Sequence, residues 1–383
     1  MGRQKAIGWA VACGTLAALS VPTSAQEIRV RVKVDPAVVE DVRAAIQDAI
    51  NSDIGREIAE ALRDAARDTR RAIPELTRLA DAAAAGWQDR NFRVEQRDSE
   101  TKTLQLGANG SLELKNVSGN ITVTAGSGRD TTVQIVRLSK GRTEADAKLG
   151  LDRVKVQVDA RGDRATVDAT YPNENRPPYS VSVDYTVTAP AGTRLTVRSI
   201  SGNTVVKGIT GDVAADVVSG GIRISDAGSV SSATTISGDV QITNANVKGS
   251  MNVSTVSGTM TLDQIKCQRL SGSVISGEVH AKDVACDNAE LKSLSGSVDY
   301  TGPLTKNGRY ELQTHSGNVH VTITGSVGFE LQASTFSGQV RLDPPLELQR
   351  STMTRKSARG TVGDGSAVVT ATAFSGDVVI TKK

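Results

Sequence analysis

A Ser-Gly pair that recurs along most of the chain is the feature that most constrains the fold. The serines of these pairs are Ser118, Ser201, Ser219, Ser237, Ser257, Ser276, Ser295, Ser316, Ser337 and Ser375. From Ser201 to Ser337 the serines follow one another at a nearly constant period, and the step from Ser337 to Ser375 equals two periods with a polar insertion around 349–360. A period of roughly 20 residues predicts stacked units that contact mainly their neighbours.

Each repeat carries the same alternation of apolar and polar residues after its Ser-Gly pair. The third residue after the serine is apolar in all repeats but one (Thr204), as at Val240 and Val298, the fifth is apolar, as at Ile242, and the one between is mostly polar. Period-two alternation is typical of a strand with one buried face. A coil of about 19 residues cannot bury that face alone, but coils stacked about 4.8 Å apart align like residues into interior ladders. We therefore expect an all-β fold, a single-stranded parallel β-solenoid (β-helix) with coils of about 19 residues, preceded by an N-terminal helical segment.

The glycine of each pair is expected to turn the chain at one corner of every coil. Glycine adopts positive φ angles and permits close backbone approach, and the preceding serine hydroxyl is expected to satisfy the corner backbone. The structural glycines predicted in this way are Gly202, Gly220, Gly238, Gly258, Gly277, Gly296, Gly317 and Gly338.

The segment 1–25 has the features of a secretory signal peptide. Arg3 and Lys5 precede an uncharged apolar stretch over 6–21, and positions 22–25 are mostly small, with Gln26 as the expected new terminus. The apolar run is shorter than the roughly 20 residues that a membrane span requires. We expect an extracytoplasmic location (periplasm, cell surface or secreted) and no membrane span after signal removal.

Residues 26–90 are expected to form a strand and a helical segment. The stretch over 27–34 alternates apolar and charged residues, and Asp35-Pro36 is a helix start. The helix that follows, within 36–86, carries an apolar stripe formed by Ile46, Ile50, Ile54, Ile58 and Leu62. The stripe fits either a helix packed on the solenoid end or a coiled-coil or partner helix, and the sequence leaves both open.

Residues 100–200 predict a broader β start, and residues 201–383 predict regular coils. Alternating runs over 131–138, 154–158, 165–171 and 181–187 predict strands, with a hairpin turn at Arg161-Gly162-Asp163. A small capped helix is expected over 143–149.

Three stretches mark the start of the repeat region: NVSGNITV at 116–123, APAG at 189–192 and VRSISG at 197–202, followed by the Ser-Gly-x-Val series. Together they resemble a bacterial family of unknown-function domains named putative adhesins, over about residues 100–383. The resemblance implies a β-solenoid with a binding or adhesion role and implies no catalytic residues.

Charge and composition argue against several classes of function. The full chain has a net charge of +3, and loss of Arg3 and Lys5 brings it close to neutral, so a nucleic-acid partner is not expected. Carbohydrate-active β-helices need convergent carboxylates, often beside aromatic platforms, but aromatics are 3% of this chain. The sequence has no Gly-x-Ser-x-Gly elbow, phosphate loop or His-Glu-x-x-His motif. We expect no enzyme, no cofactor and no metal site.

Two cysteines and three histidines are the remaining candidates for chemistry. Cys267 and Cys286 are one repeat period apart and are expected to stack on neighbouring coils. Parallel strands leave Cβ atoms wider apart than a disulfide prefers, so we expect buried thiols, with a disulfide as the alternative. His280 and His320 are expected at the surface, and His315 stands in the apolar ladder before the serines as a satisfied or half-exposed misfit.

The expected function is that of an exported, non-enzymatic binding, adhesion or structural module of the cell envelope. Its partner would be an unknown protein, a cell surface or a polysaccharide, and its oligomeric state is open. One alternative is an envelope-stress or assembly accessory protein whose N-terminal helix recruits a partner. The other is a carbohydrate-active β-helix enzyme.

Overall fold

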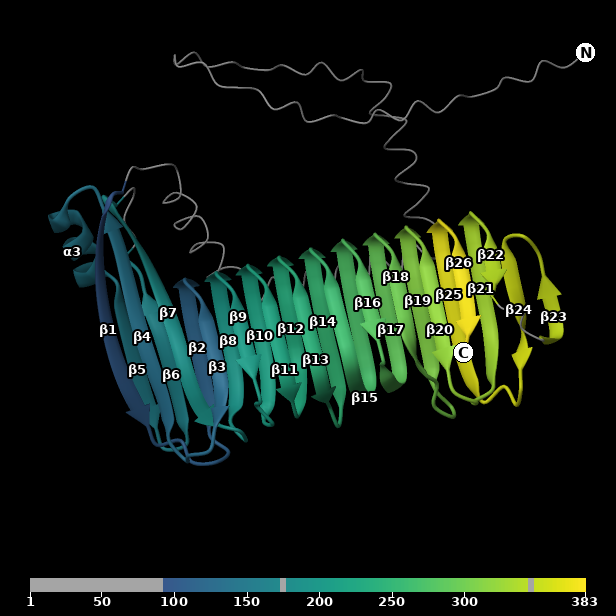
Figure 1. Ribbon diagram of the computed structural model, residues 1–383, viewed down its shortest axis with the longest axis horizontal. Helices are drawn as coiled ribbons and strands as arrows, with labels where there is room; N and C mark the ends of the chain where they lie inside the picture. The colour runs from purple at the N-terminus through teal and green to yellow at the C-terminus, as the bar shows by residue number, and fades with distance from the viewer. Residues whose placement is uncertain (1–91, 173–176, 344–347) are drawn as a thin grey trace, which may run out of the picture. The chain divides into compact units, whose positions relative to one another are not determined.

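The computed structural model describes residues 92–383 except 173–176 and 344–347 (Figure 1). The expected signal peptide at 1–25 and strand-plus-helix segment at 26–90 lie outside the described residues. Strands dominate the described part, in which α3 (Glu144–Arg153) is the one helix. None of the helical structure described is long and apolar enough to span a membrane.

Most strands belong to two rows that meet at the Ser-Gly pairs. Strands of the first row end at the serine: β2 (Ser111–Ser118), β8 (Arg194–Ser201), β10 (Asp212–Ser219), β12 (Ser229–Ser237), β14 (Ser250–Ser257), β15 (Met260–Ser276), β17 (Ala285–Ser295), β19 (Arg309–Ser316), β21 (Phe329–Ser337) and β25 (Ala367–Ser375). Strands of the second row begin at the third position after a serine: β3 (Ile121–Gly126), β9 (Thr204–Lys207), β11 (Ile222–Ala227), β13 (Val240–Asn246), the first part of β15, β16 (Val279–Lys282), β18 (Val298–Pro303), β20 (Val319–Thr324), β22 (Val340–Leu342) and β26 (Val378–Lys382).

Neighbouring coils of the middle section pair in parallel and in register. Ser219 pairs with Ser201 on one side and with Ser237 on the other, and the same serine-to-serine register continues to Ser316. The third and fifth residues after each serine face inward, as the alternation predicted. Val240, Ile242, Val298 and Tyr300 are at most 1% exposed and belong to one continuous apolar core.

The predicted corner glycines stack directly on one another. Gly277 and Gly296 have φ angles of +145° and +144°, which side chains rarely adopt. A Cβ atom built on Gly277 would lie 2.0 Å from the carbonyl oxygen of Gly258, and one built on Gly296 would lie 1.9 Å from that of Gly277. Glycine is therefore required at this corner for two reasons: it adopts the positive φ angle, and it leaves room for the carbonyl oxygen of the neighbouring coil.

The hydroxyl that satisfies this corner is not the one that the sequence suggested. Gly220 donates its N–H to the carbonyl of Ser237 at 2.8 Å, and the Gly220 carbonyl accepts from the Thr235 hydroxyl at 3.0 Å. The donor is thus the buried residue two positions before the serine. The same bond recurs from Thr255, Ser293, Thr314 and Thr335. The alternation points these side chains inward, whereas the Ser-Gly serines from Ser219 onward are exposed.

The sheet is mixed, because antiparallel strands lie at its N-terminal end. These strands are β1 (Val94–Leu104), β4 (Thr131–Gly141), β5 (Lys155–Arg161), β6 (Arg164–Thr170) and β7 (Tyr179–Pro190). β4 pairs antiparallel with both β1 and β7, and β5 with β6 around the predicted turn at Gly162. The predicted small helix is α3, capped by Thr143, which accepts a hydrogen bond from the Asp146 amide. The parallel pairing expected of the solenoid therefore does not extend to this end, where the hairpin predicted within residues 100–200 lies.

The order of the coils at the C-terminal end also differs from the expected one. β25 pairs with β19 on one side and β21 on the other, and β26 lies likewise between β20 and β22. The last coil is therefore inserted between the two that precede it in sequence. The polar insertion forms the hairpin of β23 (Gln349–Met353) and β24 (Ser357–Val362), and β24 pairs antiparallel with β21. The step from Ser337 to Ser375 has twice the usual length because it contains this hairpin. The hairpin pairs with the free edge of β21, and the chain then continues into β25, between β19 and β21.

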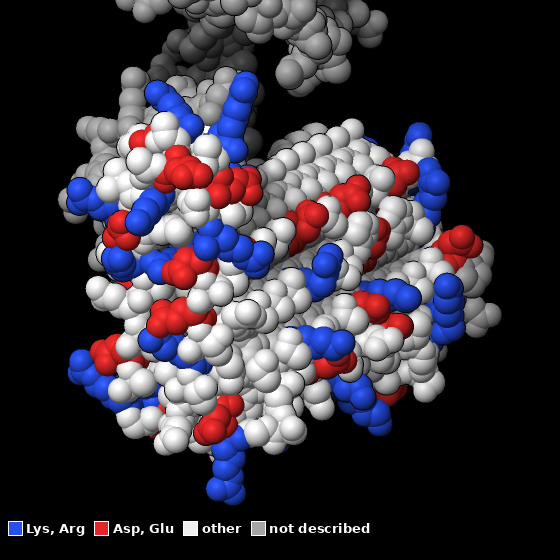
Figure 2. Space-filling view, turned by 60° about the vertical axis from the view of Figure 1, so that its left-hand side comes forward, with Lys and Arg blue, Asp and Glu red and all other residues white. Residues whose placement is uncertain are grey.

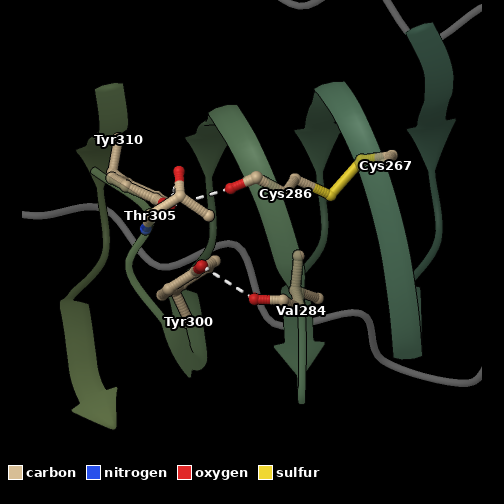
Figure 3. The surroundings of a disulfide bond; sticks show 6 residues. All are labelled: Cys267, Val284, Cys286, Tyr300, Thr305 and Tyr310. Carbon is tan, nitrogen blue, oxygen red and sulfur yellow. Dashed lines mark hydrogen bonds between the residues drawn. A yellow bond between two sulfur atoms is a disulfide. The ribbon is translucent and has the colours of Figure 1, made fainter. Parts of the chain in front are cut away.

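Cys267 and Cys286 form a disulfide, which corrects the expectation of free thiols (Figure 3). They are register partners on β15 and β17, with Cα atoms 4.5 Å apart, closer than in a regular ladder and inside the range that disulfides span. Tyr310 donates to the Cys286 carbonyl at 2.8 Å, and Tyr300 donates to the Val284 carbonyl at 3.0 Å. Buried tyrosines of the following coil thus tie it to the coil that carries Cys286.

Deleting residues 257–294 tests the stacked architecture. The deletion removes two whole coils and both cysteines and joins Val256 to Ser295 with every ladder in phase. Because each coil contacts mainly its neighbours, the shortened chain should fold and unfold cooperatively, with a free energy of unfolding lowered roughly in proportion. A control deletion of residues 257–265 should fold far less well, because an odd number inverts the inward and outward faces. Circular dichroism and thermal melting measure the structure of both deletion variants. An equal loss of structure in the two variants would contradict the stacked architecture.

Candidate functional site

The most extended exposed apolar feature of the described residues is the row that immediately precedes the Ser-Gly serines. In the order of the stack, the eight members that we call the edge row are Val218, Ile236, Val256, Ile275, Leu294, His315, Phe374 and Phe336. None is buried, and Val256, Phe374 and Phe336 are 41%, 37% and 67% exposed. The row follows from the alternation: the residue two before the serine points inward, so the residue one before it points outward.

The edge row continues a ladder whose first two members are covered. Val117 and Ile200 stand at the same position of earlier coils but are 8% and 4% exposed. At that end the Tyr171 hydroxyl reaches the Ser118 carbonyl at 3.4 Å and the Val181 carbonyl at 3.3 Å. The apolar ladder is therefore closed at its N-terminal end and open over the eight coils that follow.

Three rings stack at the C-terminal end of the edge row. The His315 and Phe374 rings lie 4.6 Å apart at an interplanar angle of 7°, and the Phe374 and Phe336 rings lie 4.8 Å apart at 6°. The Lys356 ammonium lies 5.6 Å from the centre of the Phe336 ring. This stack exists because β25 is inserted between β19 and β21, which places Phe374 between the other two rings. His315 is thus the half-exposed member of an outward row.

Small hydroxyl side chains flank the edge row on both sides. One flank is the row of Ser-Gly serines, which are exposed from Ser219 onward. The other flank, three positions before each serine, consists of Asp216, Thr234, Ser254, Ser273, Lys292, Gln313, Thr372 and Ser334. Lys292 is ion-paired with Glu290 at 2.7 Å and Glu311 at 3.8 Å. Uncharged ridges run along the body between charged rows (Figure 2).

A network of imidazoles and carboxylates around Asp299 lies on the second row of strands. The Asp299 carboxylate is 2.9 Å from His280 Nδ1 and 2.7 Å from His320 Nδ1, and His280 Nε2 lies 2.9 Å from Glu278. An imidazole carries protons on both nitrogens only when charged, so His280 can donate to both carboxylates only as imidazolium. The two imidazoles are 40% and 47% exposed, at the surface as predicted. Their shared carboxylate was missed, because it depends on three coils being in register.

A ladder of positive-φ residues lies on the second row as well. Asp226, Asn244, Gln264 and Asp283 have φ angles of 55°, 53°, 56° and 52° on consecutive coils. Asn244 donates to Asp226 at 2.7 Å, and a shallow hollow beside the ladder is lined in part by Gln264, Lys266 and Asp283. Among residues 92–383, outside the two gaps, no group of three or more His, Cys, Asp or Glu side chains could hold a metal ion.

One carboxyl beside the edge row titrates abnormally. Burial raises the pKa of Asp216 above its usual range, and the neighbouring Arg198 opposes this in part. Asp216 lies on β10, where it pairs with Arg198 of β8 and Thr234 of β12. The charged form of this carboxyl is therefore disfavoured in the folded protein.

The Asp216→Asn variant should be more stable than the parent at neutral pH. A raised folded-state pKa means that the charged carboxyl lowers the free energy of unfolding above that pKa. This penalty disappears as the pH falls below the unfolded value of about 3.9. The advantage of the variant in denaturant midpoint should therefore shrink on acidification, and the Asp130→Asn control, at an exposed position outside any helix or strand, should show little change. Destabilisation by Asp216→Asn at neutral pH would show instead that the carboxylate makes a favourable contact.

Comparisons with known proteins support the expected family over part of the chain. Residues 231–381 match the family model described as Toastrack DUF4097. No curated protein matches the chain.

Solved structures with likeness to the chain include three putative adhesins. The one from Bacteroides fragilis is 12% identical, with 75% of this chain and 97% of that chain covered and a TM-score of 0.36. The one from Parabacteroides distasonis is 8% identical, with 75% and 97% covered and a TM-score of 0.42. The one from Parabacteroides merdae is 12% identical, with 75% and 96% covered and a TM-score of 0.31. These TM-scores are too low to carry an argument, and the family model matches residues 231–381 alone.

Proposed function

We propose that this chain is an exported, non-enzymatic β-solenoid that serves the cell envelope as a binding or adhesion module, and that the edge row is its contact surface. The observation that carries this proposal is a row of half-buried or exposed apolar and aromatic side chains over eight stacked coils, of which Val256, Phe374 and Phe336 are the most exposed. Contiguous apolar surface on a folded protein is typical of interaction sites.

The composition of the edge row favours binding over a purely structural role. Aromatic side chains are enriched in protein interfaces and supply much of their binding energy. Phe336 and Phe374 belong to this class, and both leave more than a third of their surface exposed. Burial of apolar surface contributes roughly 25 cal/mol per Å², so a partner that covers the edge row gains binding energy along its whole length.

The chemistry of the described residues supports a non-enzymatic role. The Asp299 network lies on an open strand face, and its hydrogen bonds join imidazoles to carboxylates without a nucleophilic hydroxyl or thiol among them. The buried tyrosines Tyr300 and Tyr310 face the core, and burial raises the pKa of both phenols above the usual range. Such groups are held as hydrogen-bond donors and are not accessible to a polymeric substrate.

Two features support export. The segment 1–25 has the composition of a secretory signal. The disulfide between Cys267 and Cys286 suits an oxidising compartment such as the periplasm or the cell exterior. The proposed location is therefore extracytoplasmic.

The test is retention on isolated envelopes of a bacterium that expresses the chain. The Phe336→Ser/Phe374→Ser variant should be retained at least about 10-fold less than the parent, because two exposed aromatic anchors are removed. The matched control is Met353→Ser, which removes an exposed apolar side chain (56%) outside the edge row and should leave retention unchanged. Thermal melting checks that all three proteins are folded.

Two results would contradict the proposal. Equal retention of the parent, the double variant and the control would show that the edge row is not the contact surface. Release of reducing ends from envelope polysaccharide by the parent protein would show that the chain is an enzyme.

A further inference from the structure

We propose that the edge row binds a second copy of this chain, so that two solenoids pack with their edge rows along each other. This inference rests on the proposed function, because it names the partner of the same surface. Four properties of the edge row lead to it: its spacing, its relief, its lack of charge and its area.

The spacing of the edge row is matched over its whole length by another edge row. Strands in a sheet lie about 4.8 Å apart, so the row presents one side chain per coil at that interval. A helix repeats every ~5.4 Å, and one face of a strand repeats every ~6.8 Å, so either partner falls out of step within a few coils. A second copy has the same repeat and remains in step over all eight coils.

The relief of the surface is self-complementary. Branched and aromatic side chains from Val218 to Phe336 form a ridge between two rows of mostly serine and threonine. Because serine is much smaller than valine, leucine or phenylalanine, the flank formed by the Ser-Gly serines is lower than the ridge along its whole length. The ridge of one copy can lie along this lower flank of the other, in the close packing that interfaces share with protein interiors.

Contact between identical surfaces requires that few charges lie in the patch. Among the edge row and its two flanks, the carboxylates and ammonium groups are those of Asp216 and Lys292, and Lys292 already has Glu290 and Glu311 as partners. One further ammonium group, that of Lys356, lies over the Phe336 ring at the C-terminal end of the edge row. The row four positions after the serines differs, since it carries His280, Asp299 and Arg341. Self-contact through the edge-row face therefore meets less like-charge repulsion than self-contact through that other row.

The area available predicts a reversible dimer. Eight coils at about 4.8 Å give a patch about 38 Å long, and three rows give a width of about 10 Å. Each copy would contribute roughly 400 Å², about 800 Å² in total, below the roughly 1,200–2,000 Å² typical of stable complexes. The self-association should therefore be concentration-dependent, with a dissociation constant on the order of micromolar.

Sedimentation velocity of the exported chain, from about 1 to about 200 μM, tests this inference. The parent should shift from monomer to dimer as concentration rises. Val256→Asp places a carboxylate in the exposed part of the edge row and should weaken dimerisation at least about 10-fold, because the charge would be buried without a partner. Leu149→Asp is the matched control: Leu149 is also apolar and 37% exposed, but it lies on α3. This variant should dimerise like the parent.

A cross-linking experiment places the contact independently. Ser276→Cys puts a thiol beside Ile275, near the middle of the edge row, and should give a covalent dimer on mild oxidation. Gln241→Cys lies four positions after Ser237, on the other side of the corner, and should not.

The possible outcomes test the second copy and the envelope contact separately. A parent that stays monomeric at every concentration, or a Val256→Asp variant that dimerises like it, would overturn the inference. If the chain is monomeric but its retention on envelopes still depends on Phe336 and Phe374, the inference of a second copy is wrong and the proposed envelope contact stands. If the chain dimerises but is not retained on envelopes, the inference of self-contact is supported and the proposed envelope binding is contradicted.

Discussion

The approach of each corner glycine to the carbonyl of the glycine below it is the interaction on which the other features depend. A Cβ atom at Gly277 would lie 2.0 Å from the Gly258 oxygen, and one at Gly258 would lie 2.1 Å from the Gly238 oxygen, so neighbouring coils can reach their observed spacing at this corner only with glycine at each step. The same carbonyls accept the buried hydroxyls of residues such as Thr255 and Thr314, which leaves these backbone groups paired inside the core. The corner therefore fixes both the stacking distance and the phase of the alternation in every coil.

The fixed phase explains why an apolar row lies at the surface. Once the residue two before each serine points inward to the glycine carbonyl, the residue one before it has to point outward. The chain nevertheless places Ile236, Val256 and Leu294 there, and the cost of exposing them is the physical reason to treat the edge row as a contact surface. The disulfide follows from the same register, because in-phase coils bring Cys267 and Cys286 opposite each other.

The repeat and its alternation predicted the interior ladders and the glycine corner. The hairpin at Gly162 and the helix capped by Thr143 could be predicted because each depends on residues close together in sequence. It did not predict that β25 enters between β19 and β21, since equal periods do not say which coils are neighbours. The stack of His315, Phe374 and Phe336 depends on that neighbour order, and the shared carboxylate of Asp299 depends on register. Sequence alone does not separate the edge row from an interior ladder, because its residues are as apolar as those within.

The most direct test of this account is the free energy of unfolding of Gly277→Ala against that of Ser276→Ala, measured by guanidinium denaturation. Gly277 has a φ of +145° and no room for a Cβ atom, whereas the adjacent Ser276 is exposed and its hydroxyl is not the one that satisfies the corner. Gly277→Ala should lower the free energy of unfolding by at least about 3 kcal/mol, and Ser276→Ala should change it by less than about 0.5 kcal/mol. Similar small effects from both substitutions would contradict the account.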